Sequence, residues 1–264
     1  MSEYDQKEPE EQEKRDWMPW YILGGGGLAF CLSVIGYLKC SRPPERPSQS
    51  ALNVVAAAEK LDKAWSTVQM TWARRFVDLT GHQYEQPGNM SYYKKGYPNP
   101  GKGTLLNGCG FYLRDSSTIA YNQSLLESPS PGADADLAAT ILFAHEFGHH
   151  IQHVLGKDTE LDGLLATASE ADKAKLRLKY EHQADYYAGV WASVDLKFEF
   201  KRTNIEKAIK MLADFDVSIR PTLPKDGSIP DPMDYASVKE RVDWMEKGFD
   251  SGSIRAGDSI LTSK

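Results

Sequence analysis

The run Ala144-His145-Glu146-Phe147-Gly148-His149 restricts the fold and the chemistry of this chain more than any other feature. Histidines four positions apart lie on one face of an α-helix, offset by about 40° and by about 6 Å along its axis. At this spacing both imidazoles can reach one zinc ion, at about 2.0–2.1 Å. Glu146 would stand beside the metal and accept a proton from the water that the metal activates. The run therefore predicts a helix with His145 and His149 as zinc ligands and Glu146 as general base.

Two histidines on an exposed, polar helix face would be the alternative explanation of this motif. The neighbouring residues argue against it, because they are apolar: Ala138, Ala139, Ile141, Leu142, Phe143 and Ile151. A buried helix that carries two histidines and a glutamate needs partners for their polar atoms. A zinc ion would be one such partner, so the flanking sequence favours a metal site.

A catalytic zinc ion keeps three protein ligands and one open position, so a third ligand must come from elsewhere in the chain. Glu181 and Asp185 are four residues apart in a second helical segment and share one of its faces. We expect Glu181 to complete the zinc site and Asp185 to orient a ligand histidine. Asp185 as the ligand in place of Glu181 is one alternative. A pair of surface carboxylates is another, but residues 186–192 are nearly all apolar or aromatic, which indicates a packed helix.

The other four histidines are weaker candidates for metal binding. His150 and His153 do not share a helix face with both motif histidines, and His182 would point away from the face of Glu181. His82 falls in an expected loop. We expect all four to be structural or exposed.

The first part of the chain differs from the rest in charge. Residues 1–16 carry seven acidic and three basic side chains, which is −4 of the net −6, and they predict a disordered tail. The remaining −2 is spread without a basic stripe, so we expect no nucleic-acid partner. Cys109 is the one cysteine beyond residue 40, so we expect no disulfide within the body of the protein.

Residues 17–38 contain no charged side chain over 22 positions, which is long enough to cross a hydrocarbon core of about 30 Å. Aromatic residues lie near both ends of this segment, as in membrane interfaces. We expect a transmembrane helix that contacts the lipid bilayer, with a cleaved signal peptide and a buried soluble helix as the alternatives. Basic residues flank both ends almost equally, so the charge pattern favours neither orientation. Residues 39–52 are expected to be a linker, and residues 53–264 the catalytic domain.

Hydrophobic spacing and turn residues predict a mainly helical body with a small β-sheet. Helices are expected over residues 53–80, 137–155, 169–194, 204–215 and 237–247. Short strands are expected at Met90–Tyr93, Gly110–Leu113 and Thr118–Tyr121. A loop is expected after Gly156, and a loose tail after Gly252.

At these residues the chain resembles the neutral zinc metallopeptidases of bacteria, within the gluzincin group. Residues 145–152 are similar to that family's active-site helix, and residues 181–192 to the helix that carries its glutamate ligand. The segments 109–121 and 240–252 resemble its strand region and its C-terminal signature. The resemblance implies a zinc-dependent peptidase acting on proteins or peptides. Because members begin with one membrane-spanning segment, it also implies a single-pass membrane protein with an extracytoplasmic catalytic domain.

The chain departs from the family pattern in two places. The family often has a second cysteine where this chain has Leu113, so a disulfide there is lost. Members often carry His-Gly before the final helix, where this chain has Asp234-Tyr235-Ala236. Tyr235 could stabilise the oxyanion instead, because a phenol can donate a hydrogen bond to it; plain packing is the alternative.

We therefore expect an α+β, mainly helical zincin-like domain that acts as a membrane-anchored, zinc-dependent endopeptidase. The strands at residues 110–121 would bind an extended substrate by edge pairing. One alternative is a catalytically silent fold that serves as a membrane-tethered binding module, and the missing His-Gly keeps it open. A carboxylate-bridged di-iron bundle is a second alternative, but it needs a second Glu-x-x-His motif that the sequence lacks.

Overall fold

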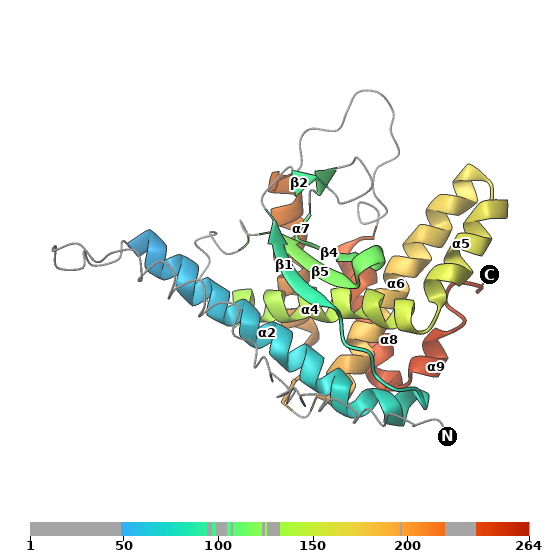
Figure 1. The fold of residues 1–264 in the computed structure, drawn as a ribbon, viewed down its shortest axis with the longest axis horizontal. Helices are drawn as coiled ribbons and strands as arrows, with labels where there is room; N and C mark the ends of the chain where they lie inside the picture. Colours follow the sequence, from blue (N-terminus) through green and yellow to red (C-terminus); the bar gives the residue numbers. More distant parts are fainter. Residues whose placement is uncertain are drawn as a thin grey trace, which may run out of the picture. The chain divides into compact units, whose positions relative to one another are not determined.

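A computed structural model describes residues 49–93, 97–98, 105–106, 108–122, 125, 133–195, 197–219 and 236–263 (Figure 1). The chain divides into two compact units, Met1–Ser41 and Arg42–Lys264, and all the described residues belong to the second unit. The helices among the described residues are α2 (Gln49–Thr80), α4 (Ala133–Val154), α5 (Lys157–Thr167), α6 (Glu170–Val194), α7 (Arg202–Ile219), α8 (Val238–Ser251) and α9 (Ile254–Gly257).

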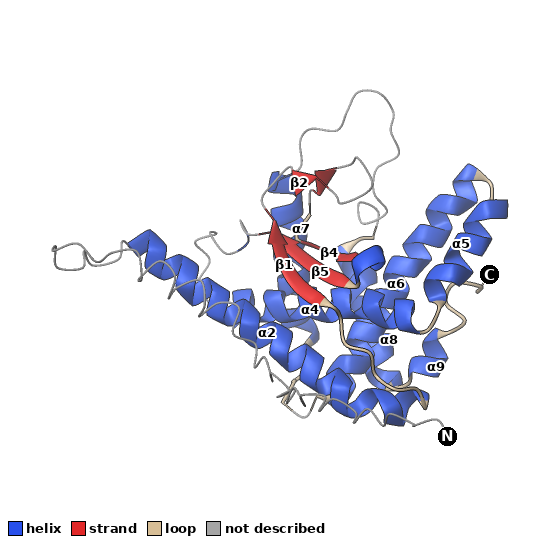
Figure 2. Ribbon diagram, in the orientation of Figure 1, coloured by secondary structure: helices blue, strands red, loops and turns tan. Residues whose placement is uncertain are grey.

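A small mixed sheet accompanies these helices. Its strands are β1 (Asn89–Tyr93), β5 (Thr118–Asn122) and β4 (Gly110–Leu113), in that spatial order. β1 pairs with β5 in parallel, and β4 pairs with β5 antiparallel. The short 3₁₀ helix η1 (Arg114–Ser116) joins β4 to β5, and β2 (Tyr97–Pro98) pairs with β3 (Leu105–Leu106) in a separate ribbon. Figure 2 shows the sheet gathered against α4, which packs on β4. The prediction of a mainly helical α+β fold with a small sheet is confirmed.

The long helix α2 packs through one apolar stripe. Its buried residues are spaced three or four apart, as one helix face requires: Leu61, Ala64, Val68, Trp72 and Phe76. The adjacent Trp65 packs its ring on Phe143 and Phe147 of α4, with centroids 5.9 and 4.9 Å away. The helix that carries the His-Glu-x-x-His motif is thereby covered on one side by α2.

Glycines let the central helices approach closely. A Cβ atom on Gly148 of α4 would lie 2.5 Å from the carbonyl oxygen of Ala184 in α6. On the other side of α6, a Cβ atom on Gly189 would lie 1.9 Å from the carbonyl oxygen of Met245 in α8. Such separations are shorter than any real Cβ contact, so larger residues at these positions would force the backbones apart. The spacing of α4, α6 and α8 therefore depends on these glycines.

Two local predictions are wrong. The segment after Gly156 was expected to be a loop, but it forms the helix α5, whose buried residues are only Asp158 and Leu161. With so few apolar side chains facing the core, α5 shows no periodic pattern in the sequence. The tail after Gly252 was expected to be loose, but it forms α9 and the turn that follows. It is held by the buried side chains of Ile254, Ile260 and Leu261.

The predicted membrane localisation is corrected here. The helices in the described part of the chain include none that is both long and apolar enough to cross a membrane. The longest of them, α2, is interrupted by charged side chains that include Lys60, Asp62 and Arg74. The segment 17–38, on which the prediction of a transmembrane helix in a bilayer depended, lies outside the described residues. A single-pass membrane protein with an extracytoplasmic domain is therefore not retained. In addition, α2 begins at Gln49, within the segment expected to be a linker.

Candidate metal centre

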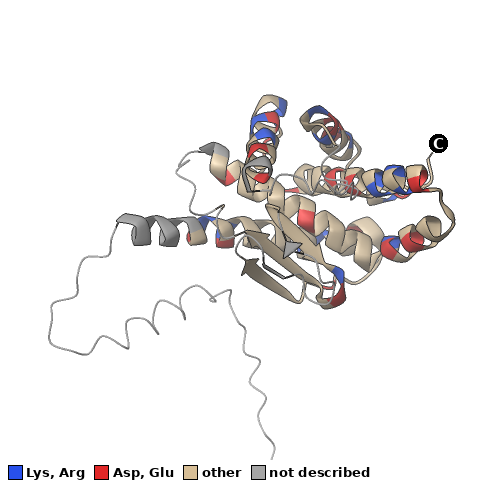
Figure 3. Ribbon diagram, turned by 90° about the horizontal axis from the view of Figure 1, so that it is seen from above, with Lys and Arg blue, Asp and Glu red and all other residues tan. Residues whose placement is uncertain are grey.

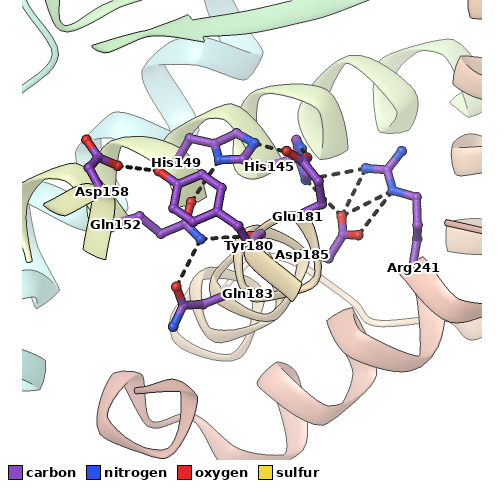
Figure 4. Close-up of polar contacts among 9 residues, drawn as sticks. All are labelled: His145, His149, Gln152, Asp158, Tyr180, Glu181, Gln183, Asp185 and Arg241. Atoms are coloured by element: carbon purple, nitrogen blue, oxygen red, sulfur yellow. Dashed lines mark hydrogen bonds and ion pairs between the residues drawn. The ribbon is translucent and has the colours of Figure 1, made fainter. Parts of the chain in front are cut away.

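Three side chains from two helices converge at the contact between α4 and α6 (Figure 4). His145 and His149 come from successive turns of α4, and Glu181 comes from α6. The Nε2 atom of each histidine lies 3.3 Å from Glu181 Oε2. All three potential ligand atoms lie within 4.8 Å of one another. These are the three residues that the sequence predicts as zinc ligands, and the fold brings them together.

The chemistry of this group fits a zinc ion. Two imidazole nitrogens and one carboxylate oxygen are a usual donor set for catalytic zinc. His145 Nε2 and Glu181 Oε2 are buried, and neither atom has a hydrogen-bond partner among the described residues, although they lie 3.3 Å apart. The two atoms meet as an ion pair without hydrogen-bond geometry, which satisfies them poorly, and a cation bound between them would satisfy both.

The other ring nitrogen of His145 is held by a carboxylate. His145 Nδ1 lies 2.9 Å from Asp185 Oδ1. Asp185 in turn accepts hydrogen bonds from Arg241 of α8, from Nη2 to Oδ1 at 2.9 Å and from Nε to Oδ2 at 3.1 Å and Oδ1 at 3.3 Å. This arrangement fixes the plane of the imidazole and leaves Nε2 facing Glu181.

The charges of this pair follow from their surroundings. Burial acts to lower the pKa of His145, but the adjacent Asp185 and Glu181 outweigh it and raise that pKa to about 10. Burial acts to raise the pKa of Asp185, but Arg241 and His145 hold that pKa at about 2. Without a metal, His145 and Asp185 therefore form a buried ion pair that Arg241 supports.

His149 has a different set of neighbours. Its Nδ1 atom lies 2.8 Å from Oε1 of Gln152, which is one turn further along α4. Its ring stacks on Tyr180, with centroids 5.3 Å apart and planes inclined by 25°. The hydroxyl of Tyr180 donates a hydrogen bond to Asp158, which also bonds with Nδ1 of His153 at 2.6 Å. Stacking and hydrogen bonding together restrict the orientation of the second imidazole.

Glu146 lies on α4 beside strand β4 and is 2% exposed. A Cβ atom on Gly110 of β4 would lie 3.2 Å from Glu146 Oε1, so the strand passes the carboxylate with no side chain between them. Burial raises the pKa of Glu146, although His145 and His149 act in the opposite direction. The carboxyl group is therefore a better proton acceptor than an exposed glutamate.

The remaining candidates lie apart from this group. His150 donates from Nε2 to the carbonyl oxygen of Glu85 at 2.6 Å, and burial lowers its pKa. His182 stacks on Trp244, and His82 is exposed after the end of α2. Tyr235, the predicted oxyanion stabiliser, lies outside the described residues. Cys109 is buried and free.

Sequence reasoning missed Arg241, Gln152 and Tyr180 as parts of the centre. Arg241 lies 56 positions from Asp185, so no local spacing connects the two residues. Gln152 lies three positions after His149, which on a helix places it on the neighbouring surface, and this spacing could have identified it. Tyr180 directly precedes the predicted ligand Glu181, but stacking cannot be derived from that position.

Comparison with known proteins agrees with this geometry. The family described as "Putative neutral zinc metallopeptidase" matches the chain over residues 36–260. The "Uncharacterized protein YpfJ" of Escherichia coli K12 is 28% identical over 198 residues, which cover 71% of this chain and 66% of that protein. The protein of the same name from Escherichia coli O6:H1 has the same identity and coverage. The chain thus spans just under two thirds of the length of these relatives. No solved structure matches the chain.

Proposed function

This chain belongs to the family of zinc metallopeptidases that it matches over residues 36–260, and we propose that it is a zinc-dependent endopeptidase. His145, His149 and Glu181 would hold the zinc ion, and Glu146 would be the general base. The convergence of three ligand atoms within 4.8 Å, two of them buried without hydrogen-bond partners in the described structure, carries this proposal.

The proposed chemistry divides between the metal and Glu146. A bound zinc ion supplies a Lewis acid that polarises a peptide carbonyl and lowers the pKa of water. Glu146 accepts a proton from the attacking water and returns it to the amine that leaves. Its burial supports this role, because a raised pKa makes the carboxylate a stronger base toward the attacking water. Tyr235 stays a proposed donor to the developing oxyanion.

Strand β4 is the proposed binding edge for substrate. The backbone N–H of Asn122 donates to the carbonyl oxygen of Cys109, so Cys109 and Asn122 are a hydrogen-bonded pair of the antiparallel ladder. Such pairs alternate with pairs that share no hydrogen bond, so the next pair, Gly110 and Tyr121, is not hydrogen-bonded. The N–H and C=O groups of Gly110 and Tyr112 therefore point away from β5. In the described part of the sheet, β4 has no strand on that side. An extended peptide could pair there, beside Glu146.

The strands of this sheet carry no charged side chains, so the edge of β4 does not select peptides by their charge. Figure 3 shows charged residues on the helices, whereas β1, β4 and β5 carry none. A substrate paired with β4 would be recognised mainly through its backbone, and less through its charge. We therefore propose unfolded or flexible protein segments as the substrate class.

Zinc content and cleavage together test the proposal. The full wild-type chain is expected to bind one zinc ion that is absent from a His149→Ala variant. Glu146→Gln is expected to keep the zinc ion but to cleave an unstructured protein at least about 100-fold more slowly. A zinc-loaded Glu146→Gln variant that cleaves at the wild-type rate would refute the role of Glu146. A wild-type chain that binds zinc but cleaves nothing would favour the alternative, a catalytically silent fold used as a binding module. The absence of His-Gly before α8 supports that alternative.

A further inference from the structure

Gln152 and Gln183 form a buried pair of amides behind the candidate metal centre (Figure 4). Both residues are 0% exposed. Gln152 Oε1 lies 2.8 Å from His149 Nδ1. Gln152 Nε2 donates to the carbonyl oxygen of Tyr180 at 2.7 Å and to Gln183 Oε1 at 3.0 Å. Gln183 Nε2 donates to the carbonyl oxygen of Gly257, in α9, at 2.8 Å. A continuous chain of hydrogen bonds therefore connects α9 to His149.

Two backbone carbonyls determine the direction of this chain, because a carbonyl oxygen only accepts hydrogen bonds. The carbonyl of Gly257 requires the NH₂ group of Gln183, so Gln183 Oε1 must face Gln152. The carbonyl of Tyr180 and Gln183 Oε1 both require the NH₂ group of Gln152. The reverse orientation of Gln152 would place its oxygen against these two oxygens, at 2.7 and 3.0 Å. Gln152 Oε1 must therefore face His149, and His149 Nδ1 must be the donor.

We propose that Gln152 is a positioning residue that holds His149 as the Nδ1–H tautomer and thereby leaves Nε2 free to bind the metal. A neutral imidazole carries one N–H, so a proton fixed on Nδ1 makes Nε2 the lone-pair donor. His149 Nε2 is the atom that faces Glu181. The carbonyl of Tyr180 alone already orients the Gln152 amide, and Gln183 adds a second acceptor for its NH₂ group. This inference rests on the metal site of the proposed function and assigns the residue that prepares one of its ligands.

The two ligand histidines thus have partners of different charge. His145 is oriented by the carboxylate of Asp185, whereas His149 is oriented by a neutral amide. Glu146 and Glu181 already lie at the centre, so a carboxylate in place of the amide would add a further buried negative charge. The amide orients the ring and adds no charge.

Zinc affinity in three forms of the full chain tests the role of Gln152. The forms are the wild type, Gln152→Met and Gln183→Met, and the dissociation constant of zinc is measured by competition with a chelator. Both substitutions replace a fully buried amide by an apolar side chain of similar length, so each is the control for the other's effect on folding. Gln152→Met removes the acceptor of His149 Nδ1–H and is expected to weaken zinc binding by about 10- to 100-fold. Gln183→Met leaves Gln152 bonded to the carbonyl of Tyr180, so a much smaller change is expected.

Two results would overturn the assignment: unchanged affinity in Gln152→Met, or an equal loss of affinity in both variants. NMR of the zinc-loaded wild type provides a test that needs no variant. The proton on His149 Nδ1 should give a slowly exchanging, hydrogen-bonded resonance, and a rapidly exchanging one would contradict the proposal. A wild-type chain that binds no zinc would refute the proposed function itself. Zinc binding and peptide cleavage by the wild type, with equal zinc binding by Gln152→Met, would refute only the role of Gln152.

Discussion

Arg241 supplies a positive charge to the buried carboxylate of Asp185, and no local pattern in the sequence predicts this contact. Its guanidinium contacts both oxygens of Asp185, a carboxylate that is 3% exposed and also contacts His145. Burial acts to lower the pKa of Arg241, but Asp185 and Glu181 raise it, so the side chain stays charged. A buried carboxylate that loses one of two cationic partners is strongly destabilised.

Replacing Arg241 by methionine should therefore destabilise the metal-free fold. We expect the free energy of unfolding to fall by about 3–5 kcal/mol, the usual effect of breaking a buried ion pair. The double variant Asp185→Asn/Arg241→Met should lose less than the sum of the two single variants, because the uncompensated charge is gone. Urea unfolding in the presence of a chelator measures all four forms. Additive losses would mean that Arg241 stabilises the fold through packing and not through Asp185.

The pKa of His145 makes zinc binding dependent on pH. This pKa is raised to about 10, above the unfolded value of about 6.5. The stability that His145 gives to the metal-free fold is therefore fully present below about pH 6.5 and is lost as the pH rises through about 10. Zinc binds only the unprotonated imidazole, so at pH 8 His145 must release a proton.

We accordingly expect zinc affinity to rise with pH between about 7 and 10, with at least one proton released per zinc ion at pH 8. Calorimetry in buffers of different ionisation enthalpy counts these protons. The matched variant Asp185→Asn should release fewer protons, because it lacks the carboxylate that raises the pKa of His145. An affinity that does not change over this range would contradict a protonated His145 in the metal-free chain.

Among the secondary-structure elements, the contact between α4 and α6 matters most for the candidate site, because each helix carries part of the proposed ligand set. Gly148 lies between His145 and His149, on the part of α4 that touches Ala184 of α6. The same close approach that packs the two helices also brings Glu181 to within 3.3 Å of both imidazoles. The residue at position 148 therefore affects both the packing of α4 on α6 and the distance of Glu181 from the two histidines.

Gly148→Ala should weaken both stability and zinc binding. The new Cβ atom would meet backbone atoms of Ala184 at 2.5 and 2.9 Å, which cannot rotate away. We expect a loss of about 1–3 kcal/mol in the free energy of unfolding and weaker zinc binding, because Glu181 moves away with α6. Gly163→Ala in α5 is the control: no described atom lies within 4 Å of its new Cβ, and it should stabilise the helix by up to about 1 kcal/mol. Unchanged zinc affinity in Gly148→Ala would show that α6 can adapt.

The sequence predicts those elements whose pattern is local. The helices around residues 137–155 and 169–194 follow from hydrophobic spacing and from the cap Ser169, whose side chain accepts a hydrogen bond from the backbone N–H of Asp172. The convergence of Glu181 with the two histidines could be expected from the number of ligands that zinc needs and from the family resemblance, but not from local spacing, because Glu181 lies 32 positions after His149. The partners Arg241 and Gln183 depend on how α8 and α9 pack, which no local pattern encodes. Helix α5 could not be predicted either, because it buries little apolar surface and therefore has no periodic apolar pattern in the sequence.

At the scale of the whole folded unit, α6 joins the motif helix α4 to the C-terminal helices α8 and α9. It packs against α4 on one side and α8 on the other, and a glycine brings the backbones together at each contact. Asp185 bonds to α8 through Arg241, and Gln183 bonds to α9 through the carbonyl of Gly257. A zinc ion held by His145, His149 and Glu181 would add a further link, between α4 and α6. Metal binding should therefore stabilise the whole unit and not only the side chains at the site.

Removal of zinc tests this coupling in the full chain. A ligand that binds only the folded state stabilises it by about 4 kcal/mol when its free concentration is 1,000 times the dissociation constant. For a folded unit of this size, that difference corresponds to a fall of about 8–16 °C in the unfolding midpoint when a chelator is added. The His149→Ala variant should unfold at one temperature with or without the chelator, because it lacks the site. A midpoint that falls equally in the variant would mean that the chelator acts elsewhere. A wild-type midpoint that stays constant while zinc is removed would mean that the contact between α4 and α6 is already complete without the metal. The glycines, and not the ion, would then join the two helices.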